Sequence, residues 1–245
     1  MIKKLQFIFK TPIYFGKSNA LDVFIQYQPD SQSHFNVHYE FNKLLNNFIK
    51  NNKKQNAGDT NRLWSFILNI KQILAEDIKG DFAELGVWRG NTAAILAHYA
   101  SLNNRKVYLF DTFEGFDQKD LGGIDSDKKM EFGDTSIDMV KNVIGSSSSS
   151  CEFIKGYFPN SLMGFHKNNK YSVVSLDCDL YEPMKAGLEY FYEHLSLGGI
   201  FFLHDYSNIH WDGSKKAIDE FCRDKNEYLI LMPDKAGSAF IRKSR

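Results

Sequence analysis

The sequence contains few cysteines, and their spacing excludes two kinds of site. Its 245 residues include only Cys151, Cys178 and Cys222, an odd and widely spaced set without a CxxC pair. A disulfide framework or a cysteine-based metal site is therefore not expected. The pattern is typical of a protein from a reducing cytoplasm.

An excess of charge of either sign is also missing. Lysine plus arginine number 30, aspartate plus glutamate number 30, and the formal net charge is zero. Such a balance argues against a protein that holds nucleic acid or an acidic membrane by bulk charge. We expect a small partner held in a pocket, with some of the aromatic residues, 15% of the chain, lining it.

Long apolar runs are absent as well. The chain opens like a signal peptide, with two lysines and an apolar run, but Lys10 and Pro12 break that run early. No small-residue cleavage site follows, so we expect no signal peptide. No segment approaches the roughly 20 apolar residues that a membrane helix needs. Hydrophobic residues at 43% and charged residues at 24% are ordinary for a globular chain. The sequence thus predicts a soluble cytoplasmic protein.

The composition of the chain changes near residue 60. Residues 1–60 are polar and rich in Asn and Gln, whereas residues 61–78 place apolar side chains on one helical face. Asp59 or Thr60 is expected to cap this helix. We therefore divide the chain into an N-terminal extension, 1–60, which would serve as a lid or an oligomerisation segment, and a domain, 61–245.

Strands and helices alternate through the predicted domain. The predicted strands are 81–86, 106–111, 151–158, 171–177 and 198–205, and the predicted helices are 91–102, 135–145, 182–195 and 214–224. This alternation predicts an α/β fold with a doubly wound, mainly parallel sheet that binds its ligand beyond the carboxyl ends of the strands.

Two further segments are predicted from composition and spacing. The five serines at 146–150 are of low complexity and predict a mobile surface loop. The chain closes with strands at 227–234 and 237–243, separated only by Lys235 and Ala236, which predicts an antiparallel hairpin.

A glycine motif follows the first predicted strand. In residues 84–92, ELGVWRGNT, Gly86 permits a tight turn and Gly90 permits close approach of the helix to a ligand. Trp88 stands where a GxGxxG pattern has its second glycine, so a pyrophosphate-cradling loop is disfavoured. An ordinary glycine turn explains the motif equally well.

Asp111 ends the second predicted strand, 25 residues after Gly86. An acid at this position can accept both hydroxyls of a ribose, although a single aspartate at a strand end is commonly a turn residue. Together with the glycine motif, Asp111 indicates a cofactor that contains a nucleoside.

Acids and a histidine follow the next two neighbouring strands. Asp177, Asp179 and Glu182 come after one strand, and His204 and Asp205 after the next. Uncompensated burial of so many carboxylates is costly, and a divalent cation such as Mg²⁺ would offset it. The alternative is an Asp179 that caps a helix beside solvent-exposed acids.

Six short motifs occur in order along the chain: ELGVWRG, FDTFEG (110–115), KGYF (155–158), LDCDLYEP (176–183), LSLGG (195–199) and HDY (204–206). Together they resemble the motifs of the macrocin O-methyltransferase family. The family comprises class I, S-adenosylmethionine-dependent and metal-requiring enzymes that methylate sugar hydroxyls. The similarity covers about residues 80 to 224, and the C-terminal hairpin suits the Rossmann-like class I methyltransferase fold. Family members often form dimers or larger assemblies, so a homo-oligomer is an expectation too.

The resemblance implies roles for individual residues. Glu84, Gly86, Trp88, Gly90, Asn91 and Thr92 would hold the amino-acid end of S-adenosylmethionine, Asp111 its ribose, and Thr112, Phe113, Gly156, Tyr157 and Phe158 its adenosine. Asp177 and Asp205 match metal ligands, and Asp179 matches the general base. Many members have two consecutive acids where this chain has His204 and Asp205, so His204 would ligate the metal, act as a base or simply pack.

The implied reaction transfers a methyl group to a hydroxyl of a sugar, in a cell-surface glycan precursor or a glycosylated natural product. Residues 112–134 and the N-terminal segment would form a lid, and the rings of Phe113, Phe116, Phe132, Tyr14 and Phe15 could pack against the sugar. For any single ring, ordinary core packing is the favoured alternative. Two other functions remain open at this point. One is a metal-independent small-molecule methyltransferase with His204 as base. The other, less favoured, is an NAD-dependent oxidoreductase, because Asp111 would also suit that ribose.

Overall fold

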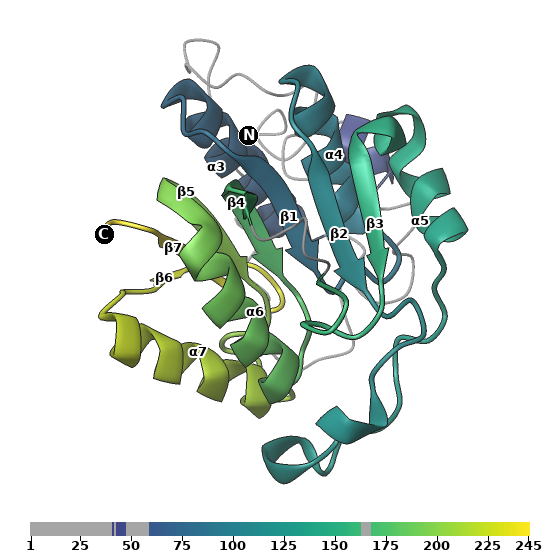
Figure 1. Cartoon of the computed structure of the whole chain (residues 1–245), viewed down its shortest axis with the longest axis vertical. Helices are drawn as coiled ribbons and strands as arrows, with labels where there is room; N and C mark the ends of the chain where they lie inside the picture. The colour runs from purple at the N-terminus through teal and green to yellow at the C-terminus, as the bar shows by residue number, and fades with distance from the viewer. Residues whose placement is uncertain (1–40, 42, 48–58, 163–167) are drawn as a thin grey trace, which may run out of the picture.

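Seven strands form one sheet in the order β3-β2-β1-β4-β5-β7-β6 (Figure 1). The structure is a computed structural model that describes residues 41, 43–47, 59–162 and 168–245. The strands are β1 (Asp81–Leu85), β2 (Val107–Asp111), β3 (Cys151–Lys155), β4 (Tyr171–Leu176), β5 (Leu195–Leu203), β6 (Ile230–Leu231) and β7 (Ala239–Arg242). β1 to β5 are parallel, and β7 and β6 complete the sheet with antiparallel pairings. The predicted doubly wound sheet with a C-terminal antiparallel hairpin is confirmed.

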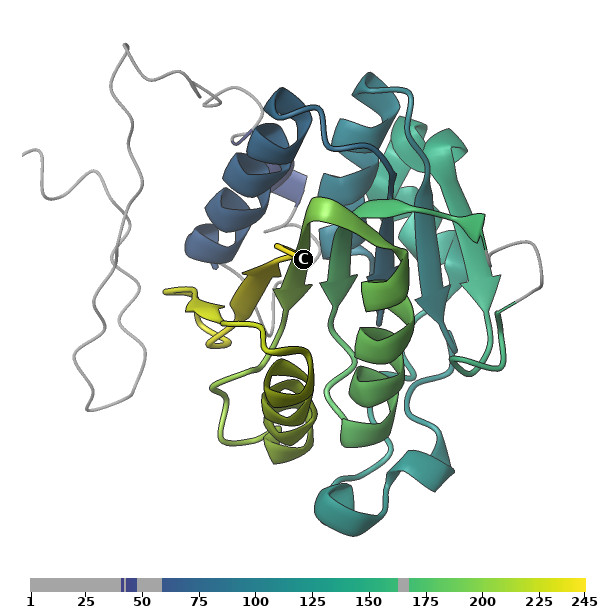
Figure 2. The ribbon, with the colours of Figure 1, turned by 60° about the vertical axis from the view of Figure 1, so that its left-hand side comes forward.

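Helices cover both faces of the sheet (Figures 1 and 2). One face carries α3 (Thr60–Ala75), α4 (Asn91–Leu102) and α5 (Ile137–Ile144), and the other carries α6 (Tyr181–His194) and α7 (Asp212–Lys225). Because side chains alternate along a strand, neighbours in β5 serve different layers. Phe202 stacks on Phe66 of α3 at 3.9 Å, while Phe201 packs edge-on against Phe221 of α7. Each layer thus has its own apolar core.

Helix α3 begins where the sequence predicts. The Asp59 carboxylate accepts a hydrogen bond from the backbone N–H of Arg62 at 3.1 Å, which is an N-cap contact. The apolar face of α3 is buried against the sheet, and Phe41 stacks on Trp64 at 3.8 Å. Most of residues 1–60, including Tyr14 and Phe15, lies outside the described residues. The lid and oligomerisation roles of that segment therefore stay predictions.

The serine run differs from its prediction. Residues Gly145–Ser150 form a 3-10 helix, η3, that continues α5 and packs on α4. Serine hydroxyls can bond to nearby backbone carbonyls, and Ser149 does so with the carbonyl of Ser146 at 3.4 Å. The predicted mobile loop is wrong because these local bonds and the contact with α4 hold the segment.

The C-terminal hairpin also differs in detail. Its strands are shorter than predicted, and the connection runs from residue 232 to 238 instead of a two-residue turn. Pro233 has no N–H to donate to a strand ladder. The N–H of Lys235 instead donates to Asp59 at 3.1 Å. The connection is thereby held against the start of α3, at the carboxyl edge of the parallel strands.

None of the helices in the described part of the chain has the length and apolar character needed to cross a membrane.

Candidate active site

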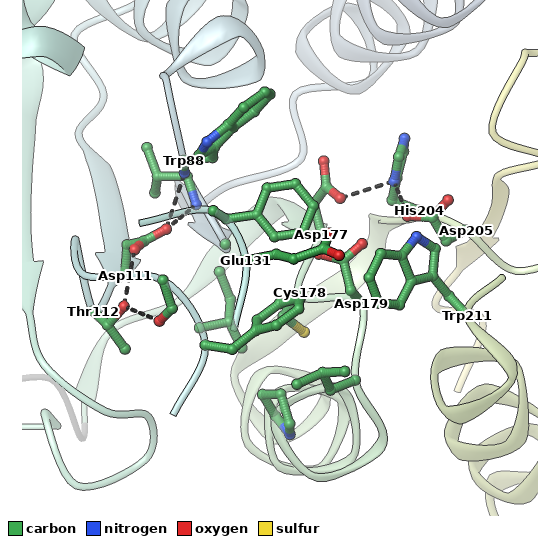
Figure 3. Close-up of a pocket in the computed structure, with 18 of the residues that line it drawn as sticks. Trp88, Asp111, Thr112, Glu131, Asp177, Cys178, Asp179, His204, Asp205 and Trp211 are labelled. Atoms are coloured by element: carbon green, nitrogen blue, oxygen red, sulfur yellow. Dashed lines mark hydrogen bonds and ion pairs between the residues drawn. The ribbon is translucent and has the colours of Figure 1, made fainter. Parts of the chain in front are cut away.

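A cavity of about 460 Å³ lies at the carboxyl edge of the sheet (Figure 3). Most residues that the sequence assigned to a site line it: Glu84, Gly86, Trp88, Asn91, Asp111, Thr112, Gly156, Tyr157, Phe158, Asp177, Asp179, His204 and Asp205. In Figure 3, Trp88 and Asp111 lie on one side of the cavity, and His204, Asp205 and Trp211 lie on the other. The fold thus gathers the predicted cofactor residues and the predicted acidic cluster around one space.

The glycine motif makes a turn that no other residue would allow. Gly86 has a φ of +85°, and a Cβ there would lie 1.9 Å from the carbonyl oxygen of Asp177. Asp111 braces the same turn, since its Oδ2 accepts from the backbone N–H of Val87 at 2.7 Å and of Trp88 at 2.9 Å. Its Oδ1 accepts from the N–H of Phe113 at 2.6 Å. Asp111 is therefore both a turn residue and part of the cavity wall.

Three of the predicted cofactor residues do not line the cavity. Gly90 begins α4, and a Cβ there would meet Val140 of α5 at 2.7 Å. Thr92 is buried, and its hydroxyl accepts a hydrogen bond from Arg62. Phe113 is in the core beside Phe153, because its backbone is drawn in by Asp111. For Phe113, the core-packing alternative is confirmed, and its ring does not line the cavity.

Glu84 is a buried acid with an unused oxygen. It is 1% exposed, and in the described structure its Oε2 has no hydrogen-bond partner. Burial, followed by the charge of Asp177, raises the pKa of Glu84 well above its usual range. A buried polar atom without a partner on a cavity wall is suited to accept from a ligand donor, such as an ammonium group.

The predicted acidic cluster has four members. One potential ligand atom from each of Asp177, Asp179, His204 and Asp205 lies within 4.8 Å of the others. The cluster forms because β4 and β5 are paired in parallel, with Leu176 opposite Leu203, so their following residues meet. Glu182 does not join it, since that residue lies exposed in the first turn of α6. The prediction that Glu182 converges on this site is wrong.

Arg62 reaches the cluster from α3, and the sequence analysis missed it. Its guanidinium donates to Asp177 Oδ2 at 2.7 Å, to Thr92 Oγ1 at 3.0 Å and toward His204 Nε2 at 2.8 Å. Arg62 is only 5% exposed. A signal was present, because an arginine next to the buried face of an amphipathic helix needs a partner inside the protein.

The groups around His204 favour different protonation states of its ring. Nδ1 is 2.5 Å from Asp205 Oδ2 and 2.8 Å from Asp177 Oδ1, while Nε2 faces Arg62. Burial and Arg62 oppose a charged ring, yet the two carboxylates raise the pKa of His204 to about 10. A guanidinium can only donate, however, so its contact requires a lone pair on Nε2 and the proton on Nδ1. The Arg62 contact therefore favours the neutral ring, whereas the two carboxylates beside Nδ1 favour the charged ring.

The acids of the cluster differ in their readiness to ionise. Although burial opposes ionisation, His204 and Arg62 hold the pKa of Asp177 well below its usual range. Burial, and then the charges of Asp205 and Asp177, raise the pKa of Asp179 well above its usual range. Asp177 is thus a permanent anion, whereas Asp179 is an acid that holds its proton more firmly.

The donor set of the cluster fits a divalent cation. Three carboxylates and an imidazole are suitable ligands for Mg²⁺ or a related ion, and their atoms are close enough to share one. In the present arrangement, both nitrogens of His204 and both oxygens of Asp177 are engaged by neighbouring side chains. The ligand types therefore suit a metal, while Arg62 already supplies one positive charge.

Aromatic rings form the wall near the cluster. Phe116, Phe132 and Trp211 contact one another with ring centroids 5.1 to 6.2 Å apart, and Phe132 also meets Trp88 at 5.4 Å. All four rings line the cavity. Phe116 and Phe132 come from residues 112–134 and Trp211 from the start of α7, so separate segments build this aromatic wall. Such a surface can pack against the apolar face of a sugar.

Solved structures with the same architecture define the class of fold. The structure resembles the O-methyltransferase NovP with a TM-score of 0.72 and 19% identity, covering 85% of this chain and all of that chain. It resembles CalS11, a calicheamicin methyltransferase, with a TM-score of 0.62 and 21% identity, covering 93% and 99% of the two chains. The protein has the class I methyltransferase fold.

Sequence comparison then identifies the family. Residues 57–233 match the family described as macrocin O-methyltransferase (TylF), and the chain belongs to this family. A Streptomyces olivaceus relative is 8-demethyl-8-(2,3-dimethoxy-alpha-L-rhamnosyl)-tetracenomycin-C 4'-O-methyltransferase, 28% identical over 62% of this chain and 61% of its own. Another, the Streptomyces niveus demethyldecarbamoylnovobiocin O-methyltransferase, is 25% identical over 62% of each chain. The chain spans about three fifths of the length of these relatives.

Proposed function

We propose that this protein transfers a methyl group from S-adenosylmethionine to a hydroxyl of a sugar. The observation that carries the proposal is that one cavity joins the Gly86–Asp111 turn and the buried oxygen of Glu84 to the acidic cluster. Membership of a methyltransferase family supports the reaction type. The rhamnosyl group in the name of the Streptomyces olivaceus relative supports a sugar acceptor, in a glycosylated natural product or a cell-surface glycan precursor.

The cofactor residues are proposed from their places on the wall. Glu84 Oε2 would accept from the ammonium of the methionyl end. Asp111 Oδ1 accepts one strong backbone bond and keeps a lone pair for a ribose hydroxyl. Residues 156–158 line the wall next to Asp111, since the N–H of Gly156 donates to the Asp111 carbonyl at 2.9 Å. The adenosine would lie there.

The acceptor hydroxyl would meet the cluster. Asp177, His204 and Asp205 would hold a divalent metal such as Mg²⁺, and when bound this ion orients neighbouring hydroxyls and lowers their pKa. Asp179, in its ionised form, would take the proton, because it lines the cavity and its raised pKa makes that carboxylate a stronger base. Phe116, Phe132 and Trp211 would pack on the sugar and set the hydroxyl in line with the methyl group.

A metal-independent methyltransferase is the second candidate. The observation in its favour is Arg62, whose positive charge offsets the negative charge of Asp177 and whose guanidinium contacts His204. In that case the base would be His204 or Asp179, and the acceptor hydroxyl would be oriented by protein side chains alone.

Chelation and an Asp177→Ala variant test the metal-dependent function. Methyl-labelled S-adenosylmethionine is incubated with nucleotide-linked sugars and sugar-bearing natural products, and label in the acceptor is counted. We expect EDTA to abolish transfer and added Mg²⁺ to restore it. Asp177→Ala should lower kcat at least about a hundredfold, since an anchoring anion is lost.

The matched control is Asp219→Ala, which removes an aspartate that pairs with Lys215 on α7 outside the cavity. Its turnover should stay close to that of the native enzyme. Full turnover in excess EDTA would reject the metal role and leave the metal-independent enzyme as the better description.

A further inference from the structure

The predicted metal site contains a cation of its own. Arg62 is permanently charged, and its guanidinium donates to Asp177 Oδ2 and to His204 Nε2, two atoms that belong to proposed ligand residues. The side chain of Arg62 is 6% exposed and that of Asp177 is 22% exposed, so water screens this ion pair little. A divalent ion that used the same residues would lie close to this charge.

The position of Arg62 is built into the fold. Asp59 caps the start of α3 through the N–H of Arg62 and also accepts from the N–H of Lys235. Thr92, at the start of α4, accepts from the same Nη2 that contacts Asp177. These contacts come from three separate segments. These contacts therefore fix the orientation of the Arg62 side chain toward the cluster.

From this geometry we propose that Arg62 competes with the divalent metal for Asp177 and His204 and thereby lowers the affinity of the site for that metal. The inference rests on the proposed metal site. Two effects act in the same direction. The guanidinium occupies ligand atoms that the metal requires, and its charge repels a second cation at short distance in a poorly solvated site. Arg62 thus acts as a positioning residue that keeps Asp177 ionised and held while no metal is bound.

The test measures metal binding without catalysis. Mn²⁺, a paramagnetic substitute for Mg²⁺, is titrated into the full chain, and free Mn²⁺ is counted by electron paramagnetic resonance. Because Arg62→Gln removes the charge, we expect it to bind Mn²⁺ about tenfold more tightly than the native protein. Arg62→Lys keeps the charge on a single nitrogen, and its affinity should stay within about threefold of the native value.

Arg89→Gln is the matched control. Arg89 pairs with Asp134 and is not among the described residues that line the cavity, so the same loss of charge should leave Mn²⁺ affinity unchanged. Should Arg62→Gln fail to melt cooperatively, Arg62→Met replaces it, because Met keeps an unbranched chain at the buried position.

Equal or weaker Mn²⁺ binding by the folded Arg62→Gln variant would overturn the proposal. The proposal would also be overturned if neither the native protein nor any variant bound Mn²⁺. That result would reject the metal role as well. A parallel titration with S-adenosylhomocysteine separates the two failures, since cofactor binding would show that the methyltransferase function stands without the metal. A tight-binding Arg62→Gln beside a native-like Arg62→Lys would establish charge competition.

Discussion

Asp179 is mostly buried but lines the cavity, and its backbone has an unusual conformation. It is 9% exposed, lines the cavity and has a φ of +60°, a region that Asp and Asn tolerate better than most residues. Asp179→Asn therefore preserves shape and backbone but removes the base. We expect kcat to fall by roughly 10²- to 10⁴-fold, with little change in the affinity for S-adenosylhomocysteine. Turnover assays and calorimetry check the two parts. A kcat within the native range would remove Asp179 from the role of base.

The individual residues of the site also differ in whether they could be predicted from the sequence. Asp177, Asp179, His204 and Asp205 follow neighbouring parallel strands, so strand ends alone bring them together. Arg62 lies 115 positions from Asp177, and its contact depends on how α3 docks against the sheet. The docking of α3 is set by the packing of large rings such as Phe66 on Phe202, and no short sequence motif reveals it.

A buried carboxylate helps to dock residues 112–134 against the helices α6 and α7. Asp125, in the 3-10 helix η2 (Gly123–Asp125), is 1% exposed, and its Oδ2 accepts from the N–H of Tyr181 at 2.8 Å. It also lies against Gly213, so the carboxylate touches the N-terminal turns of both α6 and α7, where a negative charge is favourable. In Figure 2 this segment extends past the carboxyl ends of the strands. Asp125 thus anchors the part of the chain that supplies Phe116 and Phe132.

Gly213→Ala should release that segment. A Cβ at Gly213 would lie 2.3 Å from Asp125 Oδ1, so the carboxylate must leave the helix ends at a cost of about 1–3 kcal/mol. We expect amide hydrogen exchange across residues 118–130 to accelerate about tenfold or more. Gly122→Ala is the matched control, because a Cβ there meets nothing within 4 Å. Equal exchange in the two variants would show that Asp125 does not anchor the segment.

The alternation of strands and helices was predictable because short, continuous apolar runs, typical of strands buried on both faces, alternate with longer helical segments. Glycines and acids mark the ends of these runs in 81–111 and 171–224. The serine run and the C-terminal connection were not. Gly145–Ser150 became helical through contact with α4, and residues 232–238 are held by the N–H of Lys235 on Asp59. Both structures depend on contacts with residues distant in the sequence. Local composition gives no information about such contacts.

At the scale of the whole molecule, zero net charge is an average over unequal regions. Acidic residues gather at the carboxyl edge, at Glu84, Asp111, Asp177, Asp179 and Asp205, whereas Lys235 is the one lysine among the described residues that line the cavity. The strands that carry these acids include β1, β2, β4 and β5, and the helices on both faces pack on the same strands. A ligand that contacts the acids therefore connects elements from both layers of the fold.

Binding of the cofactor should for this reason stabilise the entire domain. S-adenosylhomocysteine at about 100 times its Kd would raise the free energy of unfolding by about 2.7 kcal/mol, because it binds only the folded chain. At about 2–4 °C per kcal/mol for a chain of this size, the Tm would rise by roughly 5–10 °C. Asp111→Asn weakens the proposed ribose acceptor, so S-adenosylhomocysteine should raise the Tm of this variant less than it raises the Tm of the native protein.

NAD under the same conditions should not raise the Tm, since Trp88 occupies the place of the glycine that would admit a pyrophosphate. A Tm raised by NAD but not by S-adenosylhomocysteine would assign the cavity to an oxidoreductase instead.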